Sequence, residues 1–142
     1  MTDLVKVTLA QYFGPWWRHP DHTPERNENA HVLLTACFNL AKEMEKDGVV
    51  FSVNSKTQSG VSGSLYGGFR PQSCREGAPK SSHKEGQGLD RYDPLGQIDA
   101  WLLAHPEALG RHGLYIEHPD KTPGWSHWTV RAPKSGNRIF YP

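Results

Sequence analysis

The chain has 142 residues and a formal net charge of +1, from 16 Lys and Arg against 15 Asp and Glu. This length suits one domain. The nearly equal numbers of cations and anions argue against nucleic-acid binding, which needs clustered excess cations. No run of about 18 apolar residues is present, so the sequence predicts no membrane span. The N-terminal stretch MTDLVKVTLAQ contains an early acid and no sustained apolar core, so we expect no signal peptide. The two cysteines show no paired pattern, and Cys37 is expected in the core.

The first third of the chain is predicted to be helical. Residues 1–22 are interpreted as a lead-in segment in which Thr8 caps a short helical turn. A longer helix is predicted over residues 24–47, because Thr23 followed by Pro24 combines a good N-cap with proline at the first helical position. Its apolar residues recur in steps of three and four, which is the helical period: Ala30, Leu33, Leu34, Cys37, Phe38, Ala41 and Met44.

The rest of the chain is predicted to contain short strands and one further helix. Residues 49–51 and 61–69 are typical of strands, and residues 94–105 of a helix capped by Asp93. Three more strands are expected over residues 113–116, 127–131 and 138–141. The pattern predicts a single α+β domain over residues 1–142, with helices packed on a mostly antiparallel sheet.

The segment SSHKEGQGLD at residues 81–90 is the strongest candidate for a metal site. A seven-residue separation on a helix would place His83 and Asp90 about 10 Å apart along the axis, too far to share one ion. The two glycines instead predict a tight turn between two extended segments, which brings His83 and Asp90 together. Because a catalytic zinc needs three protein ligands, His127 is the candidate third, held between two flanking tryptophans. The alternative is a histidine packed between aromatic rings and hydrogen-bonded to the backbone.

This segment carries a family resemblance. The pattern Ser-x-His-x-x-Gly-x-Gly-x-Asp at residues 81–90, followed by a late Trp-x-His, resembles the zinc D-alanyl-D-alanine carboxypeptidase superfamily. That group includes phage L-alanyl-D-glutamate endopeptidases and shares its fold with the Hedgehog signalling domain. Its motif has Ala where this chain has Gly88, and its Ser-Gly-Tyr/Phe-Arg segment is similar to residues 67–71. The match covers about residues 60–131, and the chain as a whole resembles small, single-domain, phage-encoded peptidases of this group.

The resemblance implies a hydrolase, a zinc metallopeptidase that cleaves peptide bonds in peptidoglycan stem peptides. The enzyme would be a D-Ala-D-Ala carboxypeptidase or an L-Ala-D-Glu endopeptidase. It would act as a bacteriophage endolysin that degrades the bacterial cell wall. It assigns Zn2+ to His83, Asp90 and His127. It assigns to Arg70 the stabilisation of developing charge or the binding of a substrate carboxylate. Ser81 is expected either to orient the turn or to contact the substrate.

The acid/base group of the family is missing from its usual positions. Branches of the family carry a carboxylate three residues before the second histidine, a histidine two before it, or an aspartate two after it. This chain has Gly124, Trp125 and Thr129 there. A water-activating carboxylate must therefore come from elsewhere. Glu117 is the first candidate and Asp120 the second, with a solvated loop charge as the alternative for each.

The missing carboxylate leaves a second interpretation open. The chain would then be a catalytically inactive, zinc-stabilised module that binds cell-wall peptides or serves as a virion component. The expected partners are peptidoglycan stem peptides, or a protein in the case of the inactive module, and not nucleic acid. Without a signal peptide, we expect synthesis in the host cytoplasm, followed by action in the periplasm or cell wall, or incorporation into the phage virion.

Overall fold

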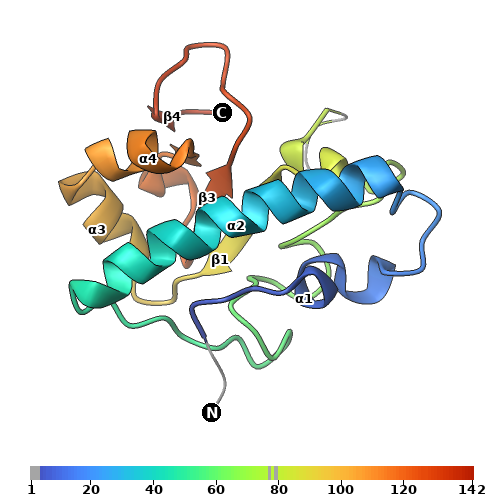
Figure 1. Cartoon of the computed structure of the whole chain (residues 1–142), viewed down its shortest axis with the longest axis horizontal. Coiled ribbons are helices and arrows are strands. Elements are labelled where there is room, and N and C mark those ends of the chain that lie inside the picture. Colours follow the sequence, from blue (N-terminus) through green and yellow to red (C-terminus); the bar gives the residue numbers. More distant parts are fainter. Residues whose placement is uncertain (1–3, 77, 79) are drawn as a thin grey trace.

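The structure is a computed structural model that describes residues 4–76, 78 and 80–142. The predicted α+β class is confirmed: the described residues form four α-helices and a four-stranded sheet (Figure 1). The helices are α1 (Leu9–Phe13), α2 (Pro24–Lys46), α3 (Gln97–Ala104) and α4 (Glu107–His112). The strands are β1 (Gly88–Tyr92), β2 (Tyr115–Glu117), β3 (Trp125–Thr129) and β4 (Ile139–Phe140). No helix in these residues is both long enough and apolar enough to cross a membrane.

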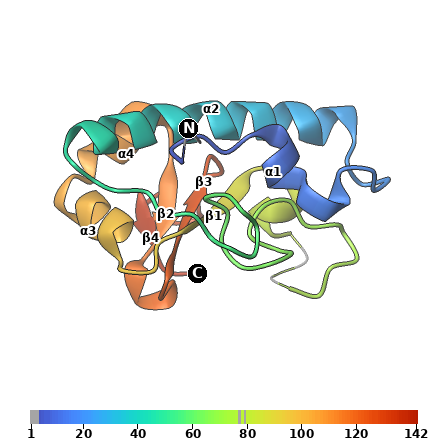
Figure 2. The ribbon, with the colours of Figure 1, turned by 90° about the horizontal axis from the view of Figure 1, so that it is seen from below.

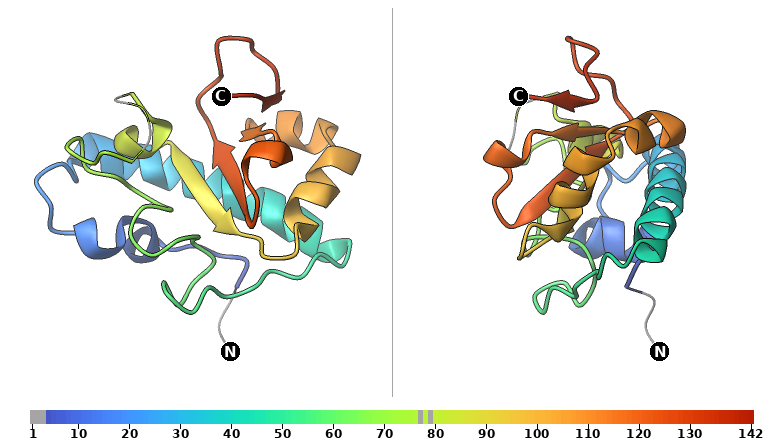
Figure 3. Two further views of the ribbon diagram at one scale, coloured as in Figure 1. Left: turned by 180° about the vertical axis from the view of Figure 1, so that it is seen from behind. Right: turned by 90° about the vertical axis from the view of Figure 1, so that its left-hand side faces the viewer.

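The sheet is mixed, with strand order β1-β3-β2-β4. Strand β3 pairs antiparallel with β1 and β2, whereas β4 pairs parallel with β2, a departure from the mostly antiparallel sheet predicted. The chain makes a long excursion after β3 before it returns as β4 (Figure 3). One face of the sheet presents Leu89, Ile116 and Trp128 to the core. Because side chains alternate along a strand, their sequence neighbours lie on the opposite face.

Helix α2 covers the core and matches its predicted bounds to within one residue. It lies along one side of the molecule with the strands beneath it (Figure 2). The Thr23 hydroxyl accepts a hydrogen bond from the Arg26 N–H at 3.2 Å, and Pro24 occupies the first turn. Cys37 is buried as predicted, which raises the pKa of its thiol to about 12. The buried stripe of the helix comprises Ala30, Leu33, Leu34, Cys37, Leu40, Ala41 and Met44.

The described part of the predicted lead-in segment is built into the core. Thr8 caps α1 as predicted, in a reciprocal capping box with Gln11. The Tyr12 hydroxyl donates to the Gly88 carbonyl at 2.8 Å, which ties α1 to the first residue of β1. The buried residues of the segment are Val5, Val7, Tyr12 and Phe13.

The strand predicted at residues 49–51 is wrong. The Val49 N–H donates to the Met44 carbonyl at 3.1 Å and so closes the end of α2. Phe51 is buried, with the Arg91 guanidinium 4.8 Å from its ring centroid. These apolar residues are therefore explained by packing against other elements and not by strand pairing.

The strand predicted at residues 61–69 is also wrong, because this segment is a loop that runs beside β1. The Asp90 N–H donates to the Gly67 carbonyl at 2.7 Å, and the Ser62 N–H donates to the Asp90 carbonyl at 2.8 Å. Glycine is required within the loop, since a Cβ at Gly67 would lie 2.1 Å from the Ser62 carbonyl oxygen. The loop thus satisfies both main-chain hydrogen-bonding groups of Asp90 at the edge of β1 that does not face β3.

The helix predicted at residues 94–105 is present but begins later, because Gly96 has a left-handed φ of +70°. The N-cap is Gly96 rather than the predicted Asp93, but the Asp93 carboxylate still accepts from the first-turn N–H groups of Ile98 and Asp99 at 3.0 and 3.1 Å. Helix α4 was not predicted, because six residues that include a glycine show no clear period. The last three predicted strands correspond to β2, β3 and β4 with shifted ends.

Candidate metal centre

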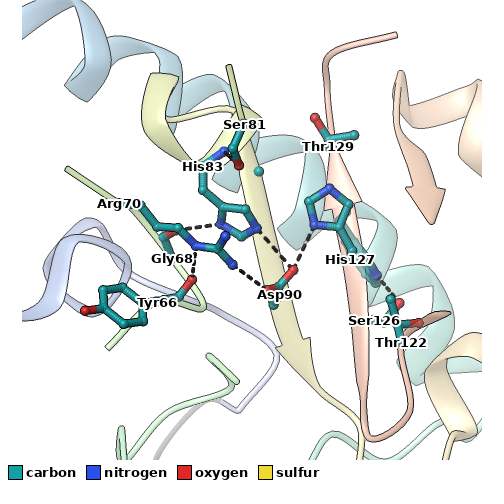
Figure 4. A network of polar contacts seen from close by, with 12 residues as sticks. Tyr66, Gly68, Arg70, Ser81, His83, Asp90, Thr122, Ser126, His127 and Thr129 are labelled. Atoms are coloured by element: carbon teal, nitrogen blue, oxygen red, sulfur yellow. Dashed lines mark hydrogen bonds and ion pairs between the residues drawn. The ribbon is translucent and has the colours of Figure 1, made fainter. Parts of the chain in front are cut away.

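The three predicted metal ligands come together. One ligand atom each from His83, Asp90 and His127 lies within 4.8 Å of the other two (Figure 4). The relative exposures of these side chains are only 4%, 13% and 12%, so the cluster is shielded but still reachable from solvent. Two imidazoles and one carboxylate form a set that can hold a metal ion.

Asp90 and His127 meet because they are direct partners across the β1–β3 ladder. Side chains of directly opposed residues project from the same face of a sheet, a few ångströms apart. The His127 Nδ1 lies 2.8 Å from the Asp90 Oδ1. The pairing of two strands therefore determines this half of the cluster.

His83 reaches the cluster from the 3-10 helix Ser82–Glu85, which corrects the predicted tight turn between extended segments. The Ser81 hydroxyl accepts from the His83 N–H at 3.3 Å, so this structure gives Ser81 the orienting role. Gly86 ends the 3-10 helix with φ +75°, and a Cβ there would lie 2.6 Å from the Arg26 carbonyl oxygen of α2. Both features require glycine at this motif position.

A backbone carbonyl determines which nitrogen of His83 faces the cluster. The His83 Nδ1–H donates to the Gly68 carbonyl at 2.7 Å, which leaves Nε2 directed at Asp90, 3.2 Å from Oδ1. Histidine ligands of metals commonly donate their other ring N–H in this way. A Cβ at Gly68 would lie 2.1 Å from the Tyr12 carbonyl oxygen, so only glycine allows the loop this close to α1. Sequence analysis missed this acceptor because it is a main-chain atom.

The electrostatics of the cluster favour an ionised Asp90 and a neutral His83, whereas they favour the protonated form of His127. Burial acts to raise the pKa of Asp90, but its contacts with His83 and His127 outweigh burial and lower it. Burial lowers the pKa of His83, and the charge and hydrogen bond of Asp90 offset only part of that effect. Burial also opposes the charge on His127, yet the hydrogen bond and charge of Asp90 prevail and raise its pKa. An ionised Asp90 and a neutral His83 therefore face each other at neutral pH.

Arg70 lies directly beside the cluster, as predicted. Its Nε donates to the Tyr66 carbonyl at 2.7 Å, and its Nη2 lies 3.4 Å from the Asp90 Oδ2 (Figure 4). A cavity of about 300 Å³ borders this edge of the cluster, and Arg70, Asp90 and Trp125 line it. A substrate in this cavity would contact the guanidinium next to the metal ligands.

Glu117 lies beside His127 on the neighbouring strand. In the β2–β3 ladder Ile116 pairs with Trp128, so the antiparallel register, continued by one residue, places Glu117 opposite His127. Glu117 is half-buried, and burial raises its pKa, with the charge of Asp90 acting in the same direction. The sheet face therefore carries Asp90, His127 and Glu117 on three adjacent strands.

Asp120, the second predicted base, makes its contacts elsewhere. It lies in the 3-10 turn Pro119–Lys121, and its side chain is 70% exposed. Its Oδ2 accepts from the Tyr141 hydroxyl at 3.4 Å. The charges that act on His127 are those of Asp90, Glu117 and Arg70. Of the two predicted carboxylates, Glu117 is therefore the one coupled to the cluster.

The three positions where the family has an acid or base are occupied in other ways. Gly124 has φ +87°, a turn conformation that disfavours any side chain. The Thr129 hydroxyl donates to the Gln87 carbonyl at 2.7 Å. Trp125 shares the cluster's sheet face, whereas Trp128 is fully buried on the other face. The expectation that both tryptophans flank the His127 ring is thus wrong for Trp128, because side chains alternate along β3.

A contact that sequence analysis missed comes from the C-terminal strand. The Phe140 ring lies edge-on to His127, with 6.5 Å between the ring centroids. Phe140 pairs with Glu117 in the parallel β2–β4 ladder, and no local pattern predicts this parallel pairing.

Comparison with protein-family models, curated proteins and solved structures finds no match to this chain.

Proposed function

We propose that this chain is a zinc-dependent peptidase that hydrolyses peptide bonds in peptidoglycan stem peptides. The observation that carries the proposal is the convergence of His83, Asp90 and His127 beside a guanidinium and a half-buried carboxylate. The spacing of the ligands and of Arg70 is the one that resembles the zinc D-alanyl-D-alanine carboxypeptidase superfamily. The proposal therefore combines a family resemblance with an arrangement that suits its chemistry.

The donor set fits zinc. Zinc in catalytic sites is bound by three nitrogen or oxygen ligands and keeps one further position for water or substrate. His83 would bind through Nε2, because its Nδ1–H is engaged by the Gly68 carbonyl. His127 would bind through Nδ1, the atom that already faces Asp90. When bound, zinc would polarise the scissile carbonyl and lower the pKa of a water molecule towards 7.

Arg70 and Glu117 would supply the protein's own share of the chemistry. The Arg70 guanidinium would stabilise negative charge that develops on the carbonyl oxygen, or hold a substrate carboxylate through its Nη groups. The carboxylate of Glu117 would accept a proton from the attacking water and pass it to the leaving amine. Burial raises the pKa of Glu117 towards the range in which a general base works best.

The first experiment tests the ligands and the reaction together. Muropeptides are incubated with zinc-loaded protein, and the products are identified by mass spectrometry, while bound zinc is counted by elemental analysis. We expect one zinc per chain and a defined cleavage product. His83→Ala and His127→Ala should lose both zinc and activity, whereas Glu107→Gln on the surface of α4 should lose neither. Cleavage by zinc-free His83→Ala protein would contradict the proposal.

The second experiment separates the two candidate bases. Glu117→Gln should retain zinc and lose about 10²–10⁴-fold in rate, which is the usual contribution of a general base. Asp120→Asn should retain most of the rate, because its carboxylate is exposed and contacts Tyr141. The reverse result would assign the base to Asp120, and full activity in both variants would remove both assignments.

A second candidate function is a zinc-stabilised module that binds stem peptides without cleaving them. It is favoured by the backbone conformation at Gly124, which leaves the family position for a carboxylate without a side chain. This candidate expects one zinc per chain and saturable binding of stem peptides, with intact muropeptides after long incubation. Any zinc-dependent cleavage product would exclude it.

A further inference from the structure

A second cavity adjoins the one at the metal cluster. The cavity beside Asp90 and Trp125 has a volume of about 300 Å³, and an outer one next to Trp16 has about 340 Å³. Both are lined by Tyr66 and Glu76, so they meet at these two side chains. Together they trace a groove that leads from the candidate metal ligands towards the segment after α1. We call the part next to Trp16 the outer groove.

Two aromatic rings in fixed positions form one side of the outer groove. The rings of Trp16 and Tyr66 are nearly parallel, at 12°, with their centroids 6.1 Å apart. The Trp16 indole N–H donates to the Leu65 carbonyl at 2.9 Å, which holds the ring in place before any ligand binds. Both side chains are half-buried, so part of each ring remains open to the groove. Rings held in this way lose little entropy when they stack on a ligand.

The polar groups of the outer groove carry balanced charge. His19, Ser73, Arg75 and Glu76 line it, with one constant cation and one carboxylate among them. This balance disfavours a strongly charged ligand of either sign. Hydroxyl, imidazole, guanidinium and carboxylate groups together suit a neutral ligand that has many hydrogen-bonding groups. Combined with the aromatic side, they select a ligand with one apolar face and a polar rim.

We propose that the outer groove binds the N-acetylated amino sugar to which the stem peptide is attached. A pyranose ring presents C–H groups on one face, which pack on an aromatic ring, and hydroxyls around its edge. The inference rests on the proposed peptidase function and extends it to the glycan. With the sugar beside Trp16, the stem peptide attached to it would extend along the groove towards Asp90, which lines the inner cavity.

The test compares a disaccharide-linked stem peptide with the same peptide free of sugar. The zinc-loaded protein should cleave the disaccharide-linked peptide with a kcat/KM about tenfold higher, mainly through a lower KM. Trp16→Ala should reduce this ratio to near one. The matched control is Trp17→Ala, which removes a 45% exposed tryptophan that does not line the groove and should preserve the ratio. Equal kcat/KM for the two peptides in the wild-type protein would overturn the sugar site and leave the peptidase proposal intact.

A binding measurement keeps the inference independent of catalysis and of the folding of the Trp16 variant. The disaccharide alone is titrated into the ¹⁵N-labelled wild-type protein, and the indole N–H signals are followed by NMR. The Trp16 signal should shift in a saturable manner, and the Trp17 signal should not. Saturable shifts without any peptide cleavage would support the sugar site and refute the peptidase. An unchanged Trp16 signal at millimolar disaccharide would refute the sugar site.

Discussion

Gly88 is the position at which residues 81–90 differ from the motif of the superfamily that they resemble, and its packing predicts a measurable coupling between positions 82 and 88. A Cβ at Gly88 would lie 2.3 Å from the Ser82 Oγ, 3.1 Å from the Ser82 Cβ and 3.2 Å from the His127 Cε1. The Ser82 side chain therefore occupies the space that an alanine methyl group would fill. No positive φ is involved at Gly88, so the obstacle to alanine is packing and not backbone conformation.

The expected magnitude follows from these contacts. Overpacking of a tight site costs about 1–3 kcal/mol, and the lower half applies because the Ser82 hydroxyl can rotate away. Alanine in place of glycine restricts the unfolded chain and returns about 0.4–1 kcal/mol. Gly88→Ala should thus destabilise the wild-type protein by about 1 kcal/mol. In a Ser82→Gly background the two shortest contacts are absent, and the same change should be neutral or slightly stabilising.

The assay is a double-mutant cycle measured by urea unfolding of the wild type, the two single variants and the double variant. We expect a coupling free energy of about 1–2 kcal/mol between positions 82 and 88, as is typical for residues in direct contact. Equal destabilisation by Gly88→Ala in both backgrounds would show that Ser82 does not fill this space. Such a result would refute packing against Ser82 as the reason for glycine at position 88.

Three further predictions concern residues of the elements that surround the cluster. Burial raises the pKa of Asp99 from 3.8 to about 6. The stability that its protonated form contributes below pH 3.8 is therefore lost as pH rises through 6. In urea unfolding, the free energy of unfolding of Asp99→Asn should exceed that of the wild type by about 1–2 kcal/mol at pH 8 and equal it near pH 4. Tyr12→Phe removes the buried hydrogen bond to Gly88 and should cost about 1–2 kcal/mol in thermal unfolding, and an unchanged Tm would contradict that role. Gly86→Ala would place a Cβ at a left-handed φ and 2.6 Å from the Arg26 carbonyl oxygen. It should lower the free energy of unfolding by about 2–4 kcal/mol and weaken zinc binding by displacing His83. An unchanged zinc affinity would exclude that displacement.

The elements that the sequence predicts well are those with local signals. Thr23 and Pro24 begin α2, and an uninterrupted apolar period continues to its end, so its bounds are almost correct. Thr8 caps α1 as predicted, and the Asp93 carboxylate binds first-turn N–H groups of α3 although Gly96 holds the N-cap position. Capping and periodicity depend on residues within a few positions of each other, and such information is present in a single sequence.

The wrong predictions concern segments whose apolar residues are buried for non-local reasons. Phe51 packs against Arg91, which is forty positions away in the chain. Residues 61–69 exchange hydrogen bonds with Asp90 of β1 and donate one to Tyr12 of α1. Local alternation cannot distinguish such a loop from a strand. The glycines at 67 and 68 were the available signal, since close approach of two backbones requires residues without a Cβ.

The candidate metal ligands were predictable in identity because their spacing is characteristic, but their arrangement was not. The expected turn at residues 81–90 is a 3-10 helix followed by a strand, and the contact of Asp90 with His127 depends on the β1–β3 register. The carbonyl of Gly68, which orients His83, belongs to a loop that the sequence assigned to a strand. Side chains carry the chemical signal in a sequence, whereas main-chain acceptors and register arise only from the fold.

Strand register also explains how the chain can have Gly124 where the superfamily it resembles has a carboxylate, and still have a carboxylate, Glu117, beside the cluster. Gly124 lies at a turn with positive φ, where a glutamate would strain the backbone by about 1 kcal/mol or more. Strand β2 pairs with β3 immediately after that turn, and its register sets Glu117 opposite His127. A carboxylate on an adjacent strand is held by the sheet, whereas one on a turn is not. Under the proposed peptidase function, Glu117 would act from the strand next to the second histidine, where the sheet supports a side chain more rigidly than a turn does.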